Sequence, residues 1–473
     1  MVDCKICRNF ASQNRSGRTS LTGREDYITP AIRLPRQREV MRTALLSLAN
    51  PYRRLNEKYR LHPVCNIFDR QPHAVSKVYP YPSIHYWDSS RLTRKDAIDM
   101  TRKNHESQEF ESIHIGKIIE EELRRQERTV TWLKSFAMDG CYDVICSGSL
   151  MGINYKEIES NAVGYKTDVD MFSLDFEEFL WAKGYSEAHI ESLFESMISV
   201  RPLGQVEFKI LSDAFKDYMV VGGMPAVVDK YITQGNFSGT LQLQRQLLLD
   251  YREDITKYAK GLDKAKILNV YDHISTFLAK DNKRFQISKI GRIARNRDYV
   301  GVIDWLALAG IVNVCYSLLQ PELPLKGNYN PDMYKLYYQD TGLLVASLDD
   351  EAQDDLRKNM NFGTYKGALY ENIVGDMLRK QGYNLYYYRN EKSTVELDFM
   401  VRDADSLVPL EVKASDAMPR SLVKMTDGRI PDIHYGVKLC GSNIGFNGQF
   451  YTFPYFLAFM LRRFLAERKV VRL

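Results

Sequence analysis

Three runs of strand-forming residues follow one another closely near the C-terminal end of the chain. They occupy residues 384–389, 395–401 and 407–413. The segments between the runs are short and polar, as hairpin connections are. A helical pattern of apolar residues over 365–381 precedes them. Together these patterns predict a helix packed on a small sheet, which is a mixed α/β domain.

Acidic side chains recur in this region with a spacing that suits a cation. Because side chains alternate between the two faces of a strand, Glu396 and Asp398 share one face. Glu411 and Lys413 likewise share a face of the next run, and the preceding helix carries Glu371 among apolar residues. Carboxylate oxygens bind hard cations such as Mg²⁺, and a lysine beside them would face a phosphate or activate water. We therefore predict that Asp398, Glu411 and Glu371 bind Mg²⁺ and that Lys413 completes a catalytic site.

The same residues also fit a domain that performs no chemistry. In that interpretation Glu411 and Lys413 are only neighbours on a solvated strand face. The domain would then recognise a protein or a nucleic acid without cleaving it. A titration with Mg²⁺ or Mn²⁺ distinguishes the two interpretations.

Several separate segments resemble a large prokaryotic family of AAA-type ATPases. Asp398, followed by Glu411-Val412-Lys413, is similar to the core of PD-(D/E)XK nucleases. Further similar segments are KLYYQDTGLL at 335–344, GALYENIV at 367–374 and VELDFMV at 395–401. In this family a conserved C-terminal domain of unknown function follows an ATP-binding domain. The resemblance implies an ATPase domain, a helical middle and a nuclease-like C-terminal α/β domain.

The ATP site that the resemblance implies lacks its phosphate-binding motifs. The phosphate loop G-x-x-x-x-G-K-[S/T] supplies backbone N–H groups, a lysine and a hydroxyl, and this chain does not contain it. An apolar strand ending in Asp-Glu is also missing before residue 131. By resemblance, Ser147 and Ser149 would occupy the sensor position beside ATP, after a strand over 142–146 in a parallel sheet. ATP is thus implied by the family only, and we expect that the chain does not bind it.

The N-terminal part of the chain differs in composition from the rest. Residues 1–100 hold 18 Lys and Arg against 9 Asp and Glu, with 14 Arg to 4 Lys, whereas the whole chain has a net charge of only +5. Only two glycines, Gly17 and Gly23, occur in the first hundred residues. Residues 1–130 are therefore interpreted as a diverged or frame-disturbed part of the ATPase domain. A genuinely different domain is the remaining alternative.

Residues 285–316 resemble a winged helix. Helices are expected over 285–294 and 298–310, and a wing strand over 311–316. Cations cluster beside the first helix, where they can neutralise DNA phosphates: Lys289, Arg292, Arg295 and Arg297. DNA is therefore a candidate partner. The alternative is a packing module whose cations serve only solubility.

These observations predict a multidomain α/β protein. Its regions are residues 1–130, a remaining AAA-type region at 131–240, a helical and winged-helix-like region at 241–345, and a nuclease-like domain at 346–473. No apolar run of about eighteen residues and no secretory signal are visible, so we expect no membrane partner and a cytoplasmic location. The seven scattered cysteines are typical of reduced thiols.

Overall fold

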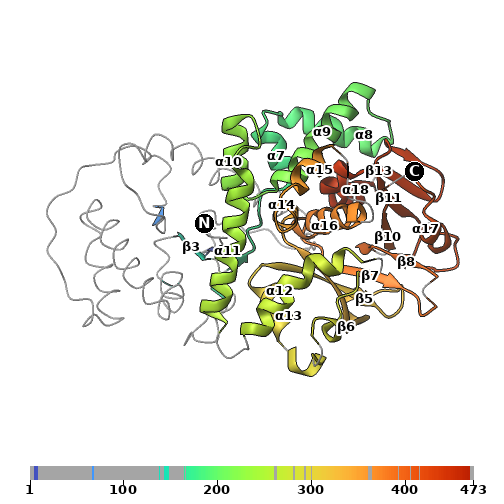
Figure 1. Cartoon of the computed structure of the whole chain (residues 1–473). Coiled ribbons are helices and arrows are strands. Elements are labelled where there is room, and N and C mark those ends of the chain that lie inside the picture. The colour runs from blue at the N-terminus through green and yellow to red at the C-terminus, as the bar shows by residue number, and fades with distance from the viewer. Residues whose placement is uncertain are drawn as a thin grey trace, which may run out of the picture. The chain divides into compact units, whose positions relative to one another are not determined.

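The computed structural model (Figure 1) describes the chain mainly from residue 164 onward. The described residues are 5–8, 67–68, 138, 143–148, 164–165, 167–259, 264–280, 283–291, 294–299, 301–358, 360, 365–392, 394–404, 406–414 and 416–468. Most of the predicted region 1–130 and Ser149 lie outside these residues. Contacts divide the chain into a unit of residues 4–171 and a unit of residues 172–473, and each is described by itself.

The described strands of the first unit form one antiparallel sheet. Its order is β2-β3-β1-β4, and the strands are β1 (Lys5–Arg8), β2 (Ile67–Phe68), β3 (Asp143–Gly148) and β4 (Thr167–Val169). Each described pairing is antiparallel, whereas the family resemblance predicted a parallel sheet here. Ser147 lies within β3, opposite Ile6 of β1, rather than in the loop after the strand.

The second unit begins with helices that have clear start and stop signals. They are α7 (Phe176–Ala182), α8 (Glu187–Ile198), α9 (Gln205–Val221), α10 (Pro225–Gln234), α11 (Thr240–Tyr258) and α12 (Lys264–Leu278). A capping box opens α7, because Asp175 and Glu178 each accept a hydrogen bond from the other's backbone N–H. Pro225 opens α10, and Gly235 ends it with a φ of 65°. Across the described residues, no helix is both long and apolar enough to cross a bilayer.

A four-stranded sheet combines strands from two distant parts of the sequence. Its order is β6-β5-β7-β8, and the strands are β5 (Val312–Leu318), β6 (Tyr329–Tyr338), β7 (Leu385–Arg389) and β8 (Glu396–Leu397). β5 pairs antiparallel with β6 and parallel with β7, while β7 and β8 form an antiparallel hairpin. Strands from both sides of the predicted boundary at residue 345 therefore share one sheet.

A five-stranded sheet completes the unit. Its order is β12-β13-β11-β10-β9, and the strands are β9 (Phe399–Asp403), β10 (Ser406–Val412), β11 (Gly436–Cys440), β12 (Gly445–Phe446) and β13 (Phe450–Pro454). β10 pairs antiparallel with β9 and parallel with β11. The remaining helices are α13 (Val302–Leu308), α14 (Thr341–Ala346), α15 (Ala352–Lys358), α16 (Tyr365–Lys380), α17 (Arg420–Met425) and α18 (Leu461–Glu467). Figure 1 shows α16 near the centre of this unit, where it packs against α14 and against strands of both sheets.

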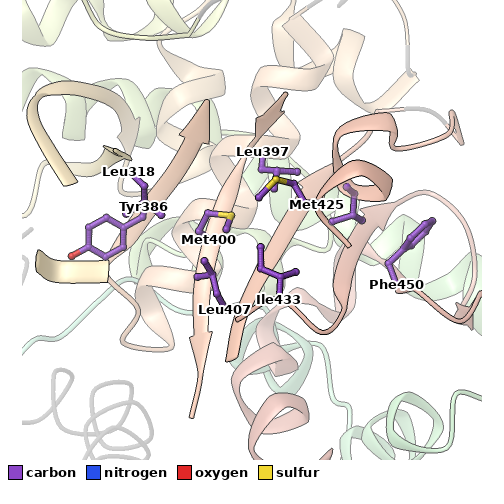
Figure 2. Packing of buried hydrophobic residues seen from close by; sticks show 9 residues of the cluster. Leu318, Tyr386, Leu397, Met400, Leu407, Met425, Ile433 and Phe450 are labelled. Carbon is purple, nitrogen blue, oxygen red and sulfur yellow. The ribbon is translucent and has the colours of Figure 1, made fainter. Parts of the chain in front are cut away.

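An apolar core joins the two sheets (Figure 2). Leu318 and Tyr386 of the four-stranded sheet pack with Met400 and Leu407 of the five-stranded sheet and with Met425 of α17. Full burial of such a side chain stabilises the fold by about 1.5–3 kcal/mol. The core therefore holds the two sheets in a fixed arrangement around the chain segment that connects them.

The predicted winged helix differs from the structure. The expected first helix is a 3₁₀ turn, Ile287–Lys289, because Phe285 ties this segment to β6 through its N–H to the Tyr334 carbonyl, at 2.8 Å. Phe285 also packs on Phe277, with ring centroids 4.5 Å apart. The expected wing strand is β5, which lies inside the four-stranded sheet between β6 and β7. Among the described residues of this region, the second expected helix is present as the short helix α13.

The joint between α9 and α10 packs closely against Asp340 and Leu174. The carboxylate of Asp340 accepts a hydrogen bond from the Gly223 N–H at 2.7 Å and from the Ser173 hydroxyl at 3.2 Å. A Cβ atom on Gly223 would lie 1.9 Å from the Leu174 carbonyl oxygen. A Cβ atom on the adjacent Gly222 would lie 2.1 Å from Oδ1 of Asp340, the N-cap residue of α14. The α9–α10 joint can therefore approach both Leu174 and Asp340 this closely only because it carries glycine.

Candidate active site

Asp398 lies at the joint between the two sheets. The run predicted as one strand over 395–401 is broken at this residue, because β8 ends at Leu397 and β9 begins at Phe399. β8 pairs with β7 in one sheet, whereas β9 pairs with β10 in the other. One carboxylate oxygen of Asp398 accepts a hydrogen bond of 2.8 Å from the Val412 N–H at the end of β10. This bond fixes the carboxylate beside the end of that strand.

Glu411 and Lys413 form an ion pair at the same end of β10. The Lys413 Nζ lies 2.6 Å from Glu411 Oε1, which confirms that the two side chains share a face. The other oxygen of Glu411 accepts a hydrogen bond of 3.1 Å from the Leu422 N–H of α17. Glu411 is 3% exposed, whereas the Lys413 side chain is 33% exposed. Lys413 therefore connects a buried carboxylate to solvent.

Glu371 projects from α16 into a buried cluster of donors. Its Oε1 accepts hydrogen bonds from Lys335, at 2.9 Å, and from the Tyr337 hydroxyl, while its Oε2 is paired with Lys283. Lys335 and Glu371 are each 1% exposed. Lys335 also lies 3.3 Å from the Glu396 carboxylate. Glu371 therefore comes from helix α16 and its charge acts on Asp398, but two lysines that the prediction did not include occupy its oxygens.

The pKa values of Asp398 and Glu371 are shifted in opposite directions. Burial, followed by the negative charge of Glu371, raises the pKa of Asp398 from 3.8 to about 7, although Lys335 and Lys283 oppose this. Burial also acts to raise the pKa of Glu371, but Lys283 and Lys335 outweigh it and hold that pKa well below its ordinary value. At neutral pH Glu371 is therefore ionised, whereas Asp398 is partly protonated.

The pKa of Lys413 is raised. Burial alone would lower it, but the hydrogen bond and charge of Glu411, with smaller contributions from Asp398 and Glu371, outweigh burial. Lys413 is therefore an ammonium group at neutral pH. Such a group can stabilise negative charge on a phosphate, and it has no lone pair with which to remove a proton from water.

The carboxylates of the site differ in their capacity to hold Mg²⁺. Within the described part of the chain, no group of three or more His, Cys, Asp and Glu side chains is arranged to hold a metal ion. Each oxygen of Glu371 is paired with a lysine, whereas Glu411 is paired with one lysine, the partly exposed Lys413, and accepts one backbone N–H from Leu422. Asp398 and Glu411 are therefore the acids at which a cation would displace fewer charged groups. Mg²⁺ commonly binds one or two carboxylates and keeps several waters, so two acids can suffice for it. The Mg²⁺ site stays a prediction, with Glu371 beside it.

The basic cluster of the winged-helix prediction is described only in part. Lys289 and Arg295 are exposed to solvent. Arg292 lies outside the described residues, and the Arg297 side chain is not among those described. DNA as a partner therefore stays a prediction.

Two domain families match the chain. Residues 212–354 match a domain of unknown function, DUF8612, and residues 366–453 match another, DUF4143, a domain often found with AAA ATPases. No curated protein and no solved structure matches the chain. Asp398, Glu411, Lys413 and Glu371 all lie in the second matched segment. Lys335 lies in the first, so the cluster around Glu371 joins the two.

Proposed function

We propose that Asp398, Glu411 and Lys413 form a nuclease-like site that hydrolyses phosphodiester bonds in a nucleic acid. The observation that carries the proposal is the ion pair of Lys413 with Glu411, 2.6 Å long, on a strand whose end also binds Asp398. Acids that can hold a cation, with an ammonium group that reaches solvent beside one of them, are groups that metal-dependent phosphodiester hydrolysis uses.

The acids and the lysine have different roles in this proposal. Asp398 and Glu411 would hold a divalent cation, and Glu371 lies behind them as a fixed negative charge. When bound, the cation would polarise a phosphoryl oxygen and lower the pKa of bound water. Lys413 would bind a phosphate oxygen and stabilise the charge that develops there, because its raised pKa keeps it protonated.

We also propose that the chain belongs among proteins related to AAA-type ATPases and that its own ATP site is lost. The similar segments between residues 131 and 460 support the relationship, as does the match of residues 366–453 to a domain often found with such ATPases. The absent phosphate loop supports the loss.

A second candidate function is a binding module without catalysis. The observation in its favour is the engagement of both Glu371 oxygens by lysines, which leaves two acids rather than three for a cation. Such a module would use Lys413 to bind a phosphate or an acidic group of its partner.

A cation titration and a cleavage assay distinguish the two candidates. Purified protein is titrated with Mn²⁺ by calorimetry, and labelled single- and double-stranded DNA and RNA are incubated with it in Mg²⁺ or in EDTA. We expect Mn²⁺ binding and Mg²⁺-dependent cleavage, and loss of both in Asp398→Asn. Glu191→Gln is the control, because Glu191 pairs on the surface with Arg463. If Asp398→Asn binds Mn²⁺ as the unmodified protein does, the binding module is the better description.

A further inference from the structure

Glu371 is held from both sides by lysines, in an arrangement that we call the lysine clamp (Lys283, Glu371 and Lys335). Lys335 donates to Oε1 at 2.9 Å, and Lys283 engages Oε2. Glu371 and Lys335 are each 1% exposed, and the Lys283 side chain is 18% exposed. A buried carboxylate whose two oxygens both bear ammonium groups has little capacity left for a metal ion.

Lys335 stands where acidic groups from separate elements converge. Its Nζ lies 2.9 Å from Glu371 of α16 and 3.3 Å from Glu396 of β8. The ammonium also lies 4.8 Å from the centre of the Tyr387 ring, a favourable cation–π contact. A bound metal cation requires oxygen ligands from several elements around one positive charge. Here the ammonium group of Lys335 occupies such a position.

We propose that the lysine clamp takes the place of a second divalent cation, so that the site binds a single ion of the Mg²⁺ class on Asp398 and Glu411. This inference rests on the proposed function. A second ion at Glu371 would have to displace a buried ammonium, which would then lack both water and a counter-charge. It would also be repelled by the other lysine. In two-metal sites a pair of ions stabilises the reacting oxygens, and here fixed lysines supply part of that positive charge.

The number of Mn²⁺ ions bound by the full chain tests the inference. Calorimetry gives the stoichiometry, and electron paramagnetic resonance distinguishes an isolated Mn²⁺ from a coupled pair. We expect one Mn²⁺ per chain and the signal of an isolated ion. Two ions per chain, or a coupled pair, would overturn this inference and leave the proposed function standing. No bound ion would overturn the proposed function and this inference with it.

Substitution of Lys283 tests whether a lysine stands in for the ion. Lys283 is the less buried of the two lysines, so its replacement is the milder change. Lys283→Gln removes the charge and leaves an oxygen of Glu371 without a cation, so we expect a second, weaker Mn²⁺ to bind. Lys283→Arg keeps the charge, and Lys289→Met removes an exposed charge from the same segment, so both should remain at one ion. A Lys283→Gln protein that still binds one ion with unchanged affinity would overturn the inference, and circular dichroism shows that each variant is folded.

Discussion

The ammonium of Lys335 lies 2.9 Å from the carboxylate of Glu371, and both residues are almost completely excluded from solvent. The two residues come from β6 and α16, which lie in segments that match two different domain families. A buried charge pair adds little net stability when it is complete, but the loss of one partner leaves an uncompensated charge. The stability of this unit therefore depends on a contact between the two matched segments.

The first prediction concerns Glu371. Glu371→Gln leaves the buried Lys335 and its neighbour Lys283 without their counter-charge, so we expect the free energy of unfolding to fall by about 3–5 kcal/mol. Urea denaturation measures the change. Glu191→Gln breaks an exposed pair with Arg463 and should cost at most about 1 kcal/mol. Equal losses in the two variants would show that the lysine clamp is not buried as described.

The second prediction concerns the pH dependence of stability. Because the pKa of Asp398 is about 7 in the folded protein against 3.8 ordinarily, the folded state binds this proton more tightly than the unfolded state does. The stabilisation that the protonated Asp398 contributes is present at low pH, and it is lost as the pH rises from 3.8 to about 7. Asp398→Asn cannot ionise, so it should become more stable relative to the unmodified protein from pH 4 to pH 8. Glu371 is present in both proteins and largely cancels in this comparison.

Thermal unfolding of the metal-free proteins near pH 4 and near pH 8 measures that difference. The substitution keeps an oxygen that can accept the Val412 N–H, so the fold should be retained. A stability difference that does not change with pH would show that Asp398 has an ordinary pKa.

The third prediction separates the role of Lys413 from metal binding. Lys413→Ala removes the ammonium but leaves Asp398 and Glu411 in place, so Mn²⁺ should still bind. Cleavage should fall by at least about 100-fold, as when one charge-stabilising group is lost from an active site. Lys424→Ala removes an exposed lysine of the nearby helix α17 and should cleave normally. Cleavage that survives in Lys413→Ala would exclude a catalytic role for this residue.

The fourth prediction concerns Gly223 in the α9–α10 joint. Gly223→Ala places a Cβ atom 1.9 Å from the Leu174 carbonyl oxygen, and the Leu174 N–H is itself bonded to the Gly223 carbonyl at 2.8 Å. The α9–α10 joint must then move away from Leu174, which should lower the free energy of unfolding by about 1–3 kcal/mol. Gly367→Ala is the matched control, because no atom lies within 4 Å of its added Cβ. Gly367 lies in α16, so alanine should be neutral there or stabilise the protein by up to about 1 kcal/mol.

The fifth prediction concerns ATP. A phosphate loop contributes several charge-assisted hydrogen bonds, each of about 1.5–3 kcal/mol, and this chain lacks the loop. We therefore expect calorimetry to detect weak binding of ATP or none. Submicromolar affinity in the purified chain would contradict the prediction.

Local patterns predicted the parts of the site that are close in sequence. Helix α16 ends one residue before the predicted limit, and the strands β7 to β10 lie within or close to the predicted runs. Hairpin geometry follows from short polar connections and alternation, both of which are visible in the sequence. The break at Asp398 was not predicted, because the alternating pattern of residues 395–401 continues through it. Only the pairing of β8 and β9 with different neighbours reveals the break.

Contacts between segments that are distant in the sequence leave no local pattern from which they could be predicted. β5 has the pattern of an ordinary short strand, and its place in the sheet depends on β7, which is remote in sequence. No pattern in the sequence around Lys283 indicates that it pairs with Glu371. Lys335 does have one, since a lysine between Tyr334 and Leu336 in an aromatic strand must find a counter-charge if the strand is buried.

The shared sheet has a consequence for how such a protein can change during evolution. Gene recombination that transferred only residues 366–453 would leave β7 without its neighbour β5 and Glu371 without Lys335. The unpaired strand edge would favour aggregation, and the buried carboxylate would lose its cation. We therefore expect the two matched segments to be inherited together rather than exchanged one without the other.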